Sequence, residues 1–117
     1  RVVRMGESLL ALPADRSPDF QRGQKLTLGI RPEHVRLHDV AGPSGQLAGQ
    51  VIGLERLGAE TLVAVLVPSV PVPVLARIAG QPSISLGDRI GASIALDHVH
   101  LFDADGQSLT FPAQKGA

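Results

Sequence analysis

LGIRPEHVRL, residues Leu28 to Leu37, is the stretch that decides the fold of this chain. Apolar residues alternate with polar or small ones from Leu26 to Arg31, which is typical of a half-buried strand. Pro32 then fixes its own φ, removes a backbone donor and biases the preceding residue toward extended geometry. Alternation resumes at Val35. The stretch therefore predicts a strand that ends in a sheet corner, and by itself it indicates no chemistry.

The rest of the chain predicts more short strands joined by tight turns. Glycine (13) and proline (9) recur every few residues, and the apolar segments between them are rich in Val, Ile and Leu. Further strands are expected at Val2–Met5 paired with Ser8–Leu12 across Gly6-Glu7, and at Gln46–Leu57, Thr61–Val67, Val74–Ala79, Ile90–Leu96 and Val99–Phe102. About nine short strands in one domain imply an all-β fold, a small barrel or sandwich.

The connections carry turn signals of their own. Gly58-Ala59-Glu60 separates two of the predicted strands, and Asp105-Gly106 is a dipeptide favoured in hairpins. The stretch VPSVPVPV, residues 67–74, contains three prolines that remove ladder donors, so it is expected to be an edge strand or an exposed connection. The segments 13–23 and 39–45 are predicted to be polar loops, and 86–89 a polar turn.

Composition excludes several function classes. The chain has 117 residues, which suits one domain, and 44% of them are hydrophobic although aromatics are only 3%. Lys plus Arg and Asp plus Glu number 11 each, so no overall field attracts nucleic acid. Three scattered phenylalanines cannot form a stacking surface for single strands. Without cysteine there is neither a disulfide framework nor a thiolate site.

The start of the chain suggests a piece of a longer protein. No apolar run approaches the ~18 residues of a membrane span, and the start RVVRMGESLL lacks the features of a signal peptide. It begins without Met and with two valines typical of a strand, so residue 1 is expected to lie inside a longer chain. Residues 1–112 are expected to form a single domain and 113–117 a flexible tail.

Three motifs of the chain together resemble those of one known family. The first is LGIRPEH in the opening stretch. The second is VIGLERLGAETLVAVLV, Val51 to Val67, with an "LG-x-ET" turn between apolar strands. The third is GDRIGASIALDHVHLFDADGQSL, Gly87 to Leu109, with "HLFD" followed by an acidic-glycine turn. With these motifs the chain resembles the C-terminal regulatory (OB-fold/TOBE) domain in the ATP-binding subunits of ABC importers of the maltose and sn-glycerol-3-phosphate type. The motifs occur in that family's order and at plausible spacing.

The resemblance implies an OB-fold-like barrel elaborated by TOBE strands. It also implies a regulatory and dimerisation role, with a second copy of the ATPase subunit, the transporter's membrane subunits and a regulatory protein as partners, and no nucleic acid. The location would be cytoplasmic, peripheral on the inner face of the plasma membrane. No cofactor is expected in this chain, and ATP and Mg²⁺ would bind a domain that it lacks. The family-motif residues, expected to serve the corner or an interface, are Gly29, Arg31, Pro32, Glu33, His34, Gly58, Glu60, Thr61, His100, Leu101, Phe102, Asp103 and Gly106.

One alternative remains open, a stand-alone module that binds molybdate or another oxyanion, because TOBE-like segments also occur in such proteins. Those modules are compact repeats of about half this length, whereas no internal repeat is visible here. The Leu-Phe-Asp closing segment also favours the sugar-importer branch.

The sequence offers no ATPase site. A P-loop needs GxxxxGK[ST], yet the two lysines, Lys25 and Lys115, each follow a glutamine. Ser44-Gly45-Gln46 resembles part of the ABC signature sequence, but it follows a proline in a predicted loop. No G-x-S-x-G nucleophile elbow occurs either. The chain is therefore predicted not to be an enzyme.

Histidines and charges allow further hypotheses. His98 and His100 are two apart on a predicted strand and would share one face, but zinc needs further ligands, so solvated or packing histidines are preferred to a metal site. Arg31 and Glu33 flank the corner proline and would either pin it by a charge-assisted hydrogen bond or contact a partner. Glu55 and Glu60 are interpreted as hairpin-end charges that keep an edge soluble.

Overall fold

The structure is a computed structural model that describes residues 2–6, 8–13, 20–38 and 47–109. Two loop segments predicted from the sequence, most of 13–23 and all of 39–45, lie outside these residues, as does the tail. The described strands are β1 (Val2–Met5), β2 (Ser8–Ala11), β3 (Thr27–Gly29), β4 (Val35–His38), β5 (Leu47–Arg56), β6 (Glu60–Leu66), β7 (Val74–Ala79), β8 (Arg89–Ile94) and β9 (His100–Phe102). Two 3₁₀ turns, η2 (Pro32–His34) and η3 (Leu96–His98), complete the described elements.

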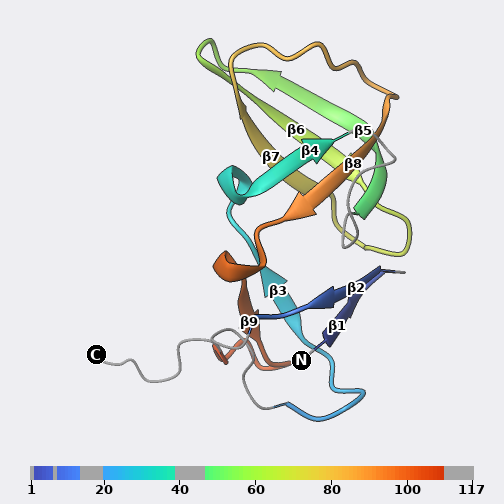
Figure 1. Cartoon of the computed structure of the whole chain (residues 1–117), viewed down its shortest axis with the longest axis vertical. Coiled ribbons are helices and arrows are strands. Elements are labelled where there is room, and N and C mark those ends of the chain that lie inside the picture. Colours follow the sequence, from blue (N-terminus) through green and yellow to red (C-terminus); the bar gives the residue numbers. More distant parts are fainter. Residues whose placement is uncertain (1, 7, 14–19, 39–46, 110–117) are drawn as a thin grey trace.

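Five strands form the larger sheet, in the order β4-β8-β5-β6-β7. All neighbours are antiparallel, and β5 pairs with β8 through its first half and with β6 through its second. A bulge between Val51 and Gly53 falls where β5 changes partner, and bulges bend the strand that carries them. The sheet curls until its edge strands β4 and β7 lie near each other, which gives the nearly closed barrel in the upper part of Figure 1.

Two small sheets lie below the barrel. β1 pairs with β2, and β3 pairs with β9, both antiparallel. Figure 1 shows that the chain enters the barrel from β3 through η2 and leaves it through η3 into β9. These two crossings are the covalent connections between the barrel and the β3–β9 sheet.

Aliphatic side chains fill the core, as the scarcity of aromatics requires. Inward positions alternate along β6, where Thr61, Val63 and Val65 are fully buried. The buried core continues from the barrel into the lower sheets through Val99 and Leu101. The all-β, OB-fold-like barrel predicted from the sequence is therefore confirmed.

Most predicted strands are confirmed, with shifts at their ends. The hairpin around residues 58–60, the strand Val74–Ala79 and the β1–β2 pair lie where they were expected. The proline-rich stretch 67–73 is a connection without strand pairing, because its prolines cannot donate to a ladder. The predicted strand Leu26–Arg31 is shorter, at Thr27–Gly29. The strand expected to reach Leu96 ends at Ile94, since η3 turns the chain toward the lower sheet.

Candidate interaction site

The corner at η2 is held by backbone hydrogen bonds. Arg31 is extended, with φ −76° and ψ 144°, as a residue before proline prefers. Its carbonyl accepts a hydrogen bond from the His34 N–H at 2.9 Å, and the Pro32 carbonyl accepts one from the Val35 N–H. The proline therefore redirects the strand into a single tight turn, which is the corner that the sequence predicts.

A histidine stack joins this corner to η3. The imidazole rings of His34 and His98 lie with centroids 3.9 Å apart and planes 17° from parallel. Beside them the His34 carbonyl accepts a hydrogen bond from the Ala95 N–H at 3.0 Å. His34 Nδ1 is buried, and no described residue hydrogen-bonds to it. The stack thus connects the two chain crossings between the barrel and the lower sheets.

This arrangement corrects the expectation for His98. The residue lies in η3 rather than on the strand that carries His100, so the two imidazoles do not share a strand face. The turn forms because the chain must leave β8 and enter β9 in a different sheet. Within the described residues no group of three His, Asp or Glu side chains is arranged to hold a metal ion.

The corner charges do not pin the corner. Arg31 and Glu33 are exposed, and within residues 20–38 and 47–109 no ion pair joins them. Backbone bonds already satisfy the turn, so the guanidinium and the carboxylate point to solvent instead. Their expected contact with a partner chain stays a prediction.

The closing segment packs against the opening stretch. Gly29 is opposite His100 in the β3–β9 pair, and buried Leu101 is opposite Leu28. A Cβ on Gly29 would lie 3.2 Å from Cε2 of Phe102, so the glycine leaves room for that ring. Two motifs of the sequence, about seventy residues apart along the chain, are therefore neighbours in one small sheet.

Asp103 organises the turn after β9. Its Oδ1 accepts hydrogen bonds from the backbone N–H groups of Asp105 and Gln107, each at 2.9 Å. Gly106 has φ +83°, a conformation that glycine adopts without steric cost. The chain then returns, and the Leu109 N–H donates to the Leu101 carbonyl at 2.7 Å. The predicted Asp-Gly turn is confirmed, and its acidic residue serves the backbone.

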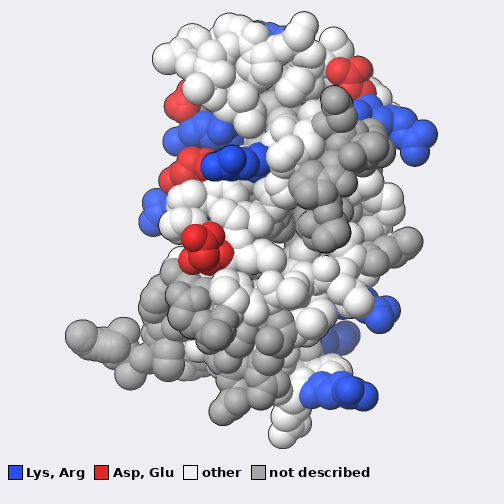
Figure 2. Space-filling model, viewed as in Figure 1, with Lys and Arg blue, Asp and Glu red and all other residues white. Residues whose placement is uncertain are grey.

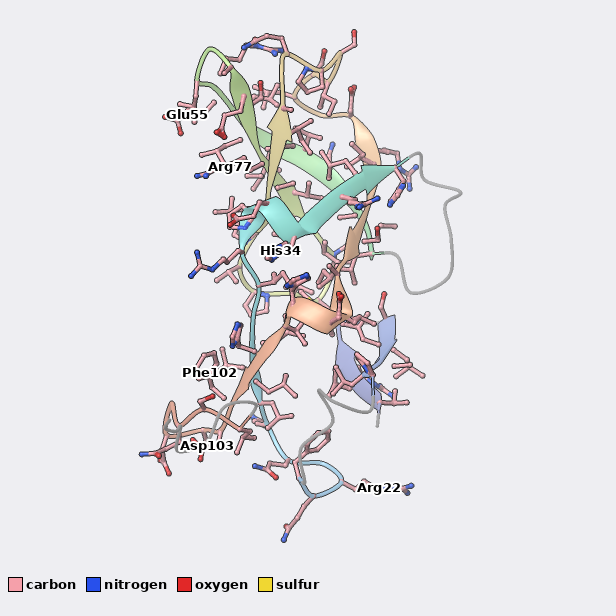
Figure 3. The ribbon with its side chains drawn as sticks, turned by 60° about the vertical axis from the view of Figure 1, so that its left-hand side comes forward. Arg22, His34, Glu55, Arg77, Phe102 and Asp103 are labelled. Atoms are coloured by element: carbon pink, nitrogen blue, oxygen red, sulfur yellow. The ribbon has the colours of Figure 1, made fainter. Side chains whose placement is uncertain are left out.

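The second motif, Val51 to Val67, lies at the far end of the barrel. Thr61 is buried and donates from its hydroxyl to the Gly80 carbonyl at 2.9 Å, while Gly58 supplies a positive φ of 84° in the hairpin turn. Glu60 forms an ion pair with Arg77, Oε2 to Nε 3.3 Å. In Figure 3, Glu55 and Arg77 lie on the barrel above His34, whereas Phe102 and Asp103 lie below it. The motif residues thus form two separate groups and no shared cleft.

The sequence patterns missed an apolar surface, the outer barrel face, which we define as Gly53, Ala64, Leu66 and Leu75. Gly53, Ala64 and Leu75 form one cross-strand row over β5, β6 and β7, and Leu66 lies beside it. Leu66 and Leu75 are 43% and 48% exposed. The sequence signal for this surface is in ETLVAVL, residues 60–66. Alternation there predicts one buried face, yet apolar residues occur on both faces of the strand. Exposed leucines gathered on one face of a sheet make that face a candidate contact surface.

Charges of both signs surround this barrel. Figure 2 shows acidic and basic groups intermixed over the upper part of one face, with no single-sign field there. At the lower right only basic groups are visible among the described residues. Among the described residues this arrangement favours recognition through local side-chain contacts over long-range electrostatic attraction. No helix among them is long and apolar enough to cross a membrane.

Comparison with known proteins shows which family this chain resembles. A model of the TOBE domain family matches residues 28–102, which include the corner, the hairpin and β9. The sn-glycerol-3-phosphate import ATP-binding protein of Paracoccus denitrificans is 37% identical over 105 residues, covering 88% of this chain and 27% of that protein.

Maltose/maltodextrin import ATP-binding proteins are similar as well. That of Escherichia coli is 34% identical over 95 residues, covering 81% of this chain and 25% of the relative. That of Aliivibrio fischeri is 29% identical over 99 residues, covering 83% and 26%. The chain thus spans about a quarter of the length of the curated relatives that it matches.

Proposed function

This chain belongs to the TOBE domain family, and from that premise we propose that it is the regulatory and dimerisation domain of an ATP-binding subunit in an importer of sugars or glycerol phosphate. The observation that carries the proposal is the similarity over 81–88% of the chain to import ATP-binding proteins for glycerol phosphate and maltose. Nucleotide binding and hydrolysis, with ATP and Mg²⁺, are assigned to a part of the subunit outside this chain.

The partners follow from the same proposal. A second copy of the subunit binds this domain, the membrane subunits bind elsewhere on the parent protein, and a regulatory protein acts through this domain. The subunit is then peripheral on the cytoplasmic face of the membrane. The alternative, an oxyanion-binding module, has no support from the relatives described above, whose names specify glycerol phosphate and maltose.

The outer barrel face supports the proposed contact between two copies. It is apolar at its centre, and its margin carries charges of both signs, Glu60 and Arg77. In a two-fold interface the same patch meets itself, so a margin with both signs can place opposite charges against each other. Surfaces of this composition, apolar inside and polar at the rim, are typical of protein interfaces.

Sedimentation of the 117-residue chain tests the contact. We expect reversible self-association, and we expect Leu75→Glu to abolish it because a carboxylate would be desolvated at the centre of the face. The matched control is Leu86→Glu, the same change at a leucine that is 64% exposed and lies outside the outer barrel face. A wild-type chain that stays monomeric at high concentration, or equal behaviour of the two variants, would contradict this interface.

A domain exchange tests the role in the importer. The corresponding segment of the Escherichia coli maltose/maltodextrin import ATP-binding protein is replaced by this chain, and growth on maltose is measured. Growth above that of a strain whose protein ends before the segment supports the proposal. A stable chimera that dimerises but gives no such growth would contradict it. Molybdate titration of the isolated chain tests the alternative in parallel.

A further inference from the structure

A groove runs along β1, outside the barrel and away from the motif residues. Its volume is about 660 Å³, and three consecutive residues of β1 line it, whereas β2 contributes only Leu9. Its opposite wall is the segment 20–24 together with Leu26. Since neighbouring residues of a strand point to opposite faces, a groove lined by consecutive residues follows the edge of that strand. We call this the β1 groove.

One edge of β1 has no strand partner in the part of the chain that the structure describes. Its only described partner, β2, occupies the other edge, so the backbone groups of the first edge pair with no described strand. One face of the hairpin is anchored, because Leu10 is buried and Val3 and Met5 pack against the core. A strand edge that is fixed in place and unpaired is a template for an added strand.

The lining supplies apolar contacts on one side of that edge. Val2 and Leu9 are 55% and 59% exposed and lie on the outer face of the hairpin. Phe20 and Leu26 are half-buried against the core and stiffen the opposite wall. That wall is shaped by a turn in which the Gln24 N–H donates to the Gln21 carbonyl at 3.0 Å. The hairpin side of the groove is therefore held in place by the core. Its apolar surface would release water when a ligand covers it.

The charge of the groove selects its occupant. Among the described residues its lining includes Arg4 and Arg22 and no acidic side chain, although the whole chain is neutral. Neither arginine forms an ion pair with another residue in the part of the chain that the structure describes. Figure 3 shows Arg22 extending away from the ribbon at the lower end of the molecule. Arginine prefers carboxylate partners and binds them with paired donors.

We propose that the β1 groove binds an extended acidic segment of a partner protein, added as a strand beside β1. Apolar side chains of the segment cover Val2 and Leu9, and its carboxylates meet Arg4 and Arg22. This surface is distinct from the outer barrel face and does not depend on the proposed importer function.

The test uses fluorescence polarisation with the 117-residue chain and a labelled peptide in which valine and glutamate alternate. We expect saturable binding that falls at least ~5-fold for Arg22→Glu, a residue exposed at a turn. The matched control is Arg36→Glu on β4, exposed and outside the groove, and it should bind as the wild type. A peptide with lysine in place of glutamate, if it binds equally well, overturns the charge argument.

Two further measurements separate the alternatives. A peptide whose backbone is N-methylated at every second residue loses its donors on one edge, so strand addition predicts at least ~5-fold weaker binding. Equal binding of that peptide overturns the proposed mode. Vesicles of phosphatidylglycerol form the other arm: if they bind the wild type and not Arg22→Glu, while the acidic peptide does not bind, the groove recognises a lipid surface and the peptide proposal is wrong. Leu75→Glu should leave peptide binding unchanged, which keeps this result separate from dimerisation.

Discussion

The barrel and the two small sheets beneath it are all built from antiparallel strands, but under different constraints. In the barrel the interior strands β5, β6 and β8 each pair on both sides, and the edge strands β4 and β7 lie close together. Below it, each of β1, β2, β3 and β9 has a single described strand partner. A two-stranded sheet is marginal by itself in water, so the lower sheets depend on packing against the rest of the molecule.

The difference separates stability from recognition. Strands that pair on both sides have no free backbone edge for a partner. A partner of the barrel would therefore contact side chains, namely those of the outer barrel face. The lower sheets have strand edges as well as side chains, and the β1 groove uses one of these edges. Elements with few buried contacts are also the ones that open most easily. Recognition by strand addition is therefore expected in the lower part of the molecule and recognition by a flat apolar face on the barrel.

The largest expected effect distinguishes the two regions directly. Leu47 in the barrel and Leu101 in β9 are both fully buried, so each change to alanine should cost about 2–5 kcal/mol of unfolding free energy. Hydrogen exchange should show that Leu101→Ala exposes amides of the lower sheets first, whereas Leu47→Ala exposes amides throughout. The control Leu86→Ala, at a largely exposed residue, should change stability by less than ~0.5 kcal/mol. Equal exposure of barrel amides in both buried variants would mean that the molecule is one cooperative unit.

A second pair of changes tests how tightly the barrel is closed. A Cβ on Gly49 would lie 2.5 Å from the Leu66 carbonyl oxygen and 2.7 Å from Cγ1 of Val65, so Gly49→Ala must move backbone. We expect a loss of about 1–3 kcal/mol, measured as the midpoint of urea unfolding. Gly53→Ala on the same strand is the matched variant, because its Cβ would meet only that of Ala64, at 3.3 Å. Equal midpoints for both variants would show that β5 is looser than its contacts indicate.

The sequence predicted the elements whose signals are local. The corner proline, the glycine of the hairpin turn and the Asp-Gly pair each restrict a few neighbouring dihedrals, and all three turns are present where they were expected. The barrel itself followed from many short apolar segments and from the family resemblance. These features need no knowledge of which distant residues meet.

What the sequence could not show depends on distant neighbours. The turn η3 replaces the end of a predicted strand because the chain changes sheets there, and the stack of His34 on His98 joins residues 64 positions apart (98 − 34). Likewise, the alternation in β6 indicated a buried face correctly but not that the other face is apolar over three strands. The β1 groove could not be predicted from the sequence, because its two walls come from segments that are separated in the chain.

A third prediction concerns the corner that connects the two regions. Arg31→Ala together with Pro32→Ala frees the unfolded chain and relaxes the extended bias before the turn, so we expect a loss of up to ~1 kcal/mol and a lower Tm. Arg36→Ala, at an exposed arginine on β4, controls for loss of a charge alone. An unchanged Tm for the double variant would mean that backbone bonds suffice to hold the corner without proline.

The smallest expected effect concerns the stack of His34 on His98, which joins the barrel to the lower sheets. His98 is exposed on one side of the stack, with 48% of its side chain accessible, so His98→Ala removes a stacking partner without opening a cavity and should cost about 0.5–1 kcal/mol. His34→Phe keeps a ring at the other position and removes the buried Nδ1 that has no described hydrogen-bond partner, so it should match or exceed the stability of the wild type. Thermal unfolding of the two variants and of their combination measures the coupling. If a ring at position 34 suffices for stacking, His98→Ala should cost as much in the His34→Phe background as in the wild type, and a cost confined to the wild type would contradict the stacking account.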